Sequence, residues 1–93
     1  MKRLKEKEEL KRLSVNERND FVADELQRLI SEMTELREEN RLSQNQVSET
    51  LGLQSHGNLT LIEQGKSIPR LDRFLRILSV YGYTLDIVSS DDA

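Results

Sequence analysis

Residues 14–40 contain no glycine or proline, and their hydrophobic residues follow the spacing of one helical face. This stripe recurs every three or four residues and consists of Val22, Leu26, Leu29, Ile30, Met33 and Leu36. Ser14, followed three residues later by Glu17, has the capping-box pattern of a helix N-terminus. We therefore predict one long helix that starts near residue 15, with Asn19 or Asp20 as a later alternative start.

Residues 2–13 are mostly lysine, arginine and glutamate, and opposite charges lie four residues apart, as in Lys5 and Glu9. Such charged runs usually face water, so we interpret residues 1–19 as a solvated helical extension. The alternative is a segment that becomes ordered against a partner protein.

Two short helices are predicted next. Ser43 and Gln46 form a second capping box, and Gly52 suits the left-handed position that ends a helix. Ser55 can cap a further helix that ends at Gly65. The hydrophobic residues expected to hold this pair onto the long helix are Val47, Leu51, Leu59 and Ile62.

Pro69 fits the first turn of another helix, which ends at Gly82. From Tyr83 to Val88 the hydrophobic period changes to alternation, which favours a short C-terminal β-strand before a polar tail. A single strand must pair with another, and the symmetric copy in a dimer is the simplest partner.

The composition limits the class of protein. With 93 residues, 35% of them hydrophobic, the chain has room for one small domain. It has no cysteine and one histidine, which excludes disulfides and leaves no usual zinc site. It also lacks a nucleophile–base pair and a glycine-rich phosphate loop, so we expect no enzyme activity, metal or cofactor. No segment resembles a membrane span or signal peptide, so we expect a cytoplasmic protein.

The net charge of −3 conceals a basic middle segment. Residues 41–76 carry five lysines and arginines against three acidic residues, a net charge of +2. This balance is compatible with DNA binding if the positive groups share one face.

The order of residues around the two short helices is the most specific signal. It reads Leu36-Arg37-x-x-x-x-Leu42-Ser43-Gln44-x-x-Val47-Ser48-x-x-Leu51-Gly52, then Leu59-Thr60-x-Ile62-Glu63-x-Gly65-Lys66-x-x-Pro69. Over residues 26–82 this order resembles the Xre/Cro-type helix-turn-helix of phage repressors. The resemblance implies an all-α, five-helix, lambda-repressor-like DNA-binding domain over residues 20–82, followed by a strand and acidic tail over residues 83–93.

The resemblance also implies roles for single residues. Arg37 and Glu63 match a buried ion pair that orients the first helix and the recognition helix. Gln44 matches a residue that meets a DNA phosphate through its side chain and backbone N–H groups. Lys66 matches a basic residue on the phosphate backbone, and Arg70 either extends that contact or is merely solvated.

Base reading in this family falls to the start of the recognition helix and to residues one turn further on. With Ser55 as the N-cap, the readers are His56, Gly57, Thr60 and Leu61. A solvated His56 without any contact is the alternative. No arginine is present in this helix, so specificity would depend on hydrogen bonds, thymine-methyl contacts and DNA shape.

The register of this helix has a second possibility. Leu59 lies seven positions after Gly52, one more than is usual in the family. With Asn58 as the N-cap, the helix would shorten and the readers would lie on a loop: Gln54, Ser55, His56 and Asn58.

The ending Ile77-Leu78-x-x-Tyr81-Gly82-x-Thr84-Leu85-x-Ile87-Val88 further resembles antitoxins of the HigA and HipB type. The two resemblances imply a homodimeric repressor that binds a palindromic operator in double-stranded DNA. As the antitoxin of a type II toxin–antitoxin module, it would also bind a cognate toxin and regulate its own operon. The alternatives are a stand-alone prophage or mobile-element regulator, and a protein-interaction module that has lost DNA binding.

Overall fold

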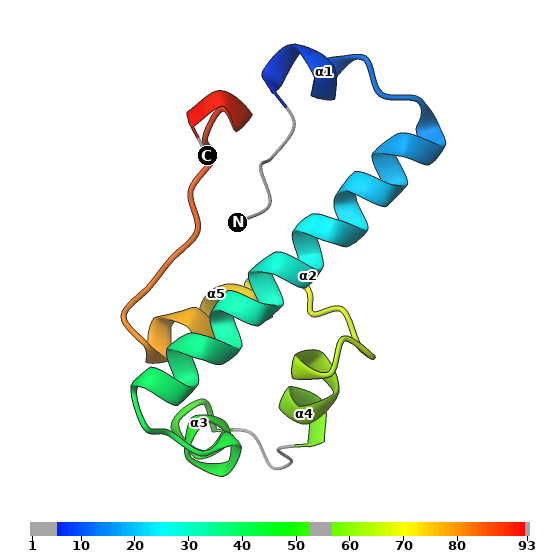
Figure 1. Cartoon of the computed structure of the whole chain (residues 1–93). Helices are drawn as coiled ribbons and strands as arrows, with labels where there is room; N and C mark the ends of the chain where they lie inside the picture. The colour runs from blue at the N-terminus through cyan, green and yellow to red at the C-terminus, as the bar shows by residue number, and fades with distance from the viewer. Residues whose placement is uncertain (1–5, 53–56, 93) are drawn as a thin grey trace.

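The computed structural model describes residues 6–52 and 57–92, in which helices are joined by short loops and followed by an irregular tail (Figure 1). In chain order the elements are α1 (Lys7–Lys11), α2 (Val15–Glu39), α3 (Gln44–Thr50), α4 (Gly57–Glu63), α5 (Leu71–Val80) and the 3₁₀-helix η1 (Ser90–Asp92). The long helix and the three helices after it therefore lie where the sequence predicts them, except that α5 begins at Leu71 with Arg70 as its N-cap, so Pro69 precedes the helix and is not in its first turn.

The long helix α2 begins with the predicted capping box. The Ser14 hydroxyl accepts a hydrogen bond from the Glu17 backbone N–H at 3.1 Å, and the Glu17 carboxylate accepts one from the Ser14 N–H at 3.0 Å. These bonds satisfy two donors that a helix N-terminus otherwise leaves free. The first half of α2 extends away from α3, α4 and α5 and buries no residue, and Val15 is 77% exposed (Figure 1).

The core lies where the second half of α2 meets α3, α4 and α5. Its buried hydrophobic side chains are Ile30, Met33, Val47, Leu59, Ile62, Phe74, Ile77, Leu78 and Tyr81. Each fully buried aliphatic or aromatic side chain of this size contributes about 1.5–3 kcal/mol. The core therefore fixes α3 and α4 to the end of α2 and leaves the first half of α2 to the solvent.

The predicted C-terminal strand is wrong. No strand occurs in residues 6–52 or 57–92, and residues 83–88 form an irregular segment that runs back toward α1 (Figure 1). Ile87 is 99% exposed and Val88 58% exposed, whereas Leu85 packs against the core. A strand needs hydrogen bonds from a neighbouring strand, and the described chain offers none. The alternation of side chains alone could not supply that partner.

The two ends of the described chain meet. The Lys7 backbone N–H donates a hydrogen bond of 2.8 Å to the Asp91 carboxylate, which places η1 against the first residue of α1. Neither α1 nor η1 buries a residue, so this contact lies at the surface.

Candidate nucleic-acid interface

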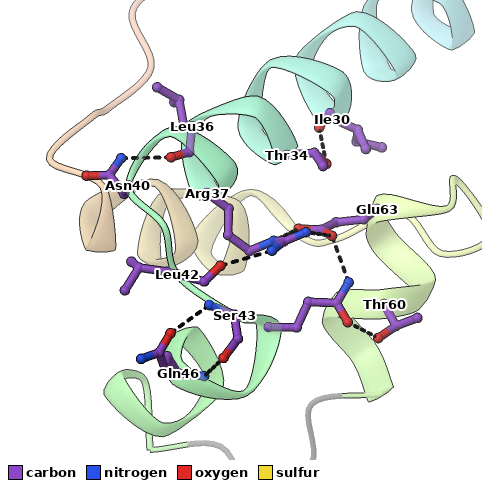
Figure 2. Close-up of polar contacts among 11 residues, drawn as sticks. Ile30, Thr34, Leu36, Arg37, Asn40, Leu42, Ser43, Gln46, Thr60 and Glu63 are labelled. Carbon is purple, nitrogen blue, oxygen red and sulfur yellow. Dashed lines mark hydrogen bonds and ion pairs between the residues drawn. The ribbon is translucent and has the colours of Figure 1, made fainter.

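α3 and α4 form two short helices on either side of the Gly52 turn. The Ser43 hydroxyl accepts a hydrogen bond of 3.1 Å from the Gln46 N–H, and the Gln46 side chain accepts one of 2.7 Å from the Ser43 N–H (Figure 2). This is the predicted capping box of α3. Gly52, at φ 73°, adopts the left-handed conformation after the helix, for which glycine pays no steric cost.

The inner face of α3 packs on its neighbours through Val47 and Ser48, which are 0% and 3% exposed. The Ser48 hydroxyl has no hydrogen-bond partner within the described chain. A small residue at position 48 lets the helices approach closely. Because the hydroxyl makes no hydrogen bond in the described chain, it adds no hydrogen-bond energy there.

α4 has a buried face and an exposed face. Leu59 and Ile62 are 3% and 2% exposed and point into the core, whereas Leu61 is 42% exposed and Gln64, just after the helix, is exposed. Leu61 and Gln64 follow Gly57 by four and seven residues, so all three positions share one side of the helix. That side is free within the described chain.

A polar network fixes α4 to α2. The Arg37 guanidinium donates two hydrogen bonds to the Glu63 carboxylate, at 2.7 Å from Nε and 2.9 Å from Nη2, and a third of 2.9 Å to the Leu42 carbonyl (Figure 2). The Arg37 and Glu63 side chains are 16% and 7% exposed. The hydrogen bond to Glu63 raises the pKa of Arg37 above its ordinary value. The sequence-predicted pair Arg37 and Glu63 is thus brought together with bidentate geometry.

Gln44 and Thr60 join the same network. The Gln44 side-chain N–H donates a hydrogen bond of 2.7 Å to Glu63 Oε1, and the Thr60 hydroxyl donates one of 2.6 Å to Gln44 Oε1. Both residues are half-buried. Side chains predicted to meet a phosphate and a base therefore bond to each other in the free protein.

Tyr81 borders the network, and the sequence analysis gave it no role there. It is 6% exposed, and burial together with the nearby Glu63 carboxylate raises the pKa of its hydroxyl to about 12. Only the fold brings this end of α5 to Glu63, so no spacing in the sequence indicated it.

The comparisons with known proteins agree with this geometry. A family model for the helix-turn-helix matches residues 33–88, which is more than half of the chain. The chain belongs to the helix-turn-helix family. Members are DNA-binding transcription regulators, and the match spans α3, α4 and α5 together with the end of α2. No curated protein and no solved structure matches the chain significantly.

The helix-turn-helix has positive side chains just after α4. Lys66 is exposed, and its backbone N–H caps the end of the helix by donating to the Leu61 carbonyl at 2.9 Å. Arg70 is exposed, with Nε 3.5 Å from the Asp72 carboxylate, and Arg76 shares that carboxylate at 3.2 Å. Exposed pairs of this kind bind weakly, so Arg70 can exchange its partner for a phosphate at little cost.

Part of the predicted reading set lies outside the described residues. Ser55, His56 and the Gln54 of the alternative register belong to residues 53–56, and the side chain of Asn58 is likewise not described. Gly57 is the first residue of α4, so Asn58 lies inside the helix and is not its N-cap.

Among the described residues, no three His, Cys, Asp or Glu side chains are arranged to hold a metal ion. Of the described helices, none is both long and apolar enough to cross a membrane.

Proposed function

We propose that this helix-turn-helix protein is a transcriptional repressor that recognises a specific DNA sequence by inserting α4 into the major groove. The observation that carries the proposal is the exposed side of α4, with Leu61 and Gln64, on a helix held from behind by Leu59, Ile62 and the Glu63 network. A rigidly held helix with a free outer face meets the geometric requirement for reading base edges.

Phosphate contacts come, in this proposal, from Lys66 just after α4 and from Arg70 at the start of α5. Base contacts come from the outer side of α4, from Asn58 in its first turn, and from His56, which precedes the helix. Without an arginine in the helix to bind guanine, each recognition helix supplies modest affinity.

We therefore propose that the protein binds as a homodimer to a palindromic site. Two copies of α4 would read half-sites about 34–36 Å apart, one helical turn of DNA. The number of phosphates neutralised doubles, which raises affinity at low salt and steepens its salt dependence.

Fluorescence anisotropy with a duplex selected from a random-sequence pool tests this function. The expected result is saturable binding, at least about a hundredfold weaker binding to a scrambled duplex of equal length, and two protomers per selected duplex. Equal affinity for both duplexes, or no binding at low salt, would contradict it. No binding would favour the alternative of a protein-interaction module, for which the overall charge of −3 is the motive.

An antitoxin role is a second proposal, based on the segments outside the matched region. Residues 6–32 precede the match, and their first helix lies against η1 at the end of the tail. Such surfaces could hold a toxin while α4 binds DNA. Co-expression with the product of the neighbouring gene is the test: a stable complex that relieves growth inhibition supports the role. A chain that binds its operator but none of the neighbouring products is instead a stand-alone regulator.

A further inference from the structure

In the protein without DNA, the side chains of Gln44 and Thr60 are already hydrogen-bonded to other side chains. The Thr60 hydroxyl donates to Gln44 Oε1 at 2.6 Å, and Gln44 Nε2 donates to Glu63 Oε1 at 2.7 Å. Glu63 Oε1 also accepts from Arg37 at 2.9 Å. One chain of hydrogen bonds thus runs from Arg37 on α2 to Glu63 on α4, and through Gln44 on α3 back to Thr60 on α4.

The chemistry of the partners fixes the direction of every bond in this chain. A buried carboxylate paired with arginine only accepts hydrogen bonds, so it requires the NH₂ end of the Gln44 amide. The Gln44 oxygen then faces Thr60, whose hydroxyl must donate its only proton. Thr60 therefore has no proton left for a base, and the Gln44 amide uses its oxygen and one of its two N–H donors.

The outer side of α4 has a different polar side chain available. Gln64 is exposed, with no side-chain hydrogen bond in the described part of the protein, and it lies three residues after Leu61 on the same side. A glutamine amide can donate to and accept from an adenine edge at once.

From these contacts we propose that Thr60 and Gln44 are positioning residues that fix α4 at its angle to α3, and that Gln64, just after α4, is the specificity-determining polar side chain on the outer side of this helix. The inference rests on the proposed DNA-binding function, and it reassigns Thr60 from base reading to positioning. Gln44 likewise positions α4 through its bond to Thr60.

A double-mutant cycle on DNA affinity tests the positioning pair. Thr60→Val removes the hydroxyl at nearly constant volume, and we expect about tenfold weaker binding to the selected duplex with unchanged base preference. Gln44→Ala also removes the bond to Glu63 and should produce at least as large a loss, and the double variant should lose little more than Gln44→Ala, which already lacks the Thr60 bond. Thr60→Ser keeps the hydroxyl and should bind the selected duplex as tightly as the parent protein does.

The matched control is Thr34→Val. The Thr34 hydroxyl donates to the Ile30 carbonyl at 2.9 Å within α2 and takes no part in the hydrogen bonds drawn between α2, α3 and α4 (Figure 2). Its removal should leave DNA affinity unchanged. If Thr60→Val does not fold, Thr60→Ala, a better helix former, takes its place in the cycle.

Base preference, measured by selection from a random pool, separates the two roles. Gln64→Ala should change the preferred base at one or two positions, and Thr60→Val should change none. A change of preference in Thr60→Val, or losses from Thr60 and Gln44 that simply add, would overturn the inference. So would a Thr60→Val protein that melts earlier yet binds with parental affinity, because the hydroxyl would then be merely structural. These results leave the proposed function intact, whereas a parent protein that binds no duplex overturns both.

Discussion

At the scale of single residues, Glu63 is the side chain through which α4 is hydrogen-bonded to both α2 and α3. It accepts hydrogen bonds from Arg37 and Gln44 while only 7% exposed. A buried ion pair adds little net stability, but removing one partner leaves the other charge buried and unpaired, which is strongly destabilising.

Arg37→Ala should therefore destabilise the protein strongly. It leaves the Glu63 carboxylate buried without its cation, and we expect the free energy of unfolding to fall by about 3 kcal/mol, measured by urea denaturation. Arg28→Ala is the control, because Arg28 pairs with Glu25 and Glu32 at the surface of α2 and is 41% exposed. Its effect should stay below about 1 kcal/mol. Equal effects of the two changes would contradict the role given to the Glu63 pair.

Tyr81 makes stability depend on alkaline pH. Its pKa is about 12 in the folded chain against an ordinary value of 10.0, because burial and Glu63 disfavour the phenolate. The proton is thus bound more tightly in the folded state. The contribution of this proton to the free energy of unfolding is complete below pH 10 and is lost as the pH rises toward 12.

We expect urea denaturation to show this loss in the parent, and a smaller loss over the same pH range in Tyr81→Phe. The difference between the two proteins isolates Tyr81 from the other groups that titrate there. The same loss in both proteins would show that Tyr81 ionises as easily folded as unfolded.

At the scale of helices and turns, local patterns predicted what depends on local contacts. The Ser14 and Ser43 capping boxes fixed two helix starts, since their hydrogen bonds join residues three apart. The predicted C-terminal strand was wrong because a strand needs a partner strand, and the alternating pattern of residues 83–88 contains no information about a partner. Likewise Gln44 and Thr60 are sixteen residues apart in sequence, and only the packing of α3 on α4 turns their side chains toward each other.

The end of α2 carries an element-scale prediction. Arg41 has φ 56°, a left-handed conformation that costs about 1 kcal/mol in a residue with a side chain. Arg41→Gly should raise the free energy of unfolding by about that amount, which corresponds to a melting temperature about 4–8 °C higher. Asn40→Gly is the control, because Asn40 has an ordinary φ of −81° and gains nothing from glycine. No rise in the melting temperature of Arg41→Gly would show that this turn is not strained.

At the scale of the whole molecule, the chain combines a packed DNA-binding unit with a long solvent-exposed arm. The principal extents are 43, 24 and 23 Å, and the core lies at the end of α2 that meets α3 to α5 (Figure 1). The sequence predicted this unit well because its hydrophobic spacing is regular. The docking of the tail on α1 was not predictable, because it involves contacts between distant residues, such as the hydrogen bond between Lys7 and Asp91, 84 positions apart.

Asp91→Ala tests that docking. It removes the acceptor of the Lys7 N–H, so hydrogen exchange at the Lys7 amide should accelerate several-fold in NMR spectra. The melting temperature should hardly change, because neither helix at this contact buries a residue. Unchanged exchange at Lys7 would mean that the tail does not stay docked in solution.

The central claim is that the outer side of α4 enters the DNA groove, and the affinity of Leu61→Glu tests it most directly. Leu61 is 42% exposed, so the change should leave the melting temperature within a few degrees of the parent value. A carboxylate there would face the phosphates and base edges, and we predict affinity for the selected duplex to fall by about a hundredfold or more. A folded Leu61→Glu protein that binds this duplex as tightly as the parent would contradict the account.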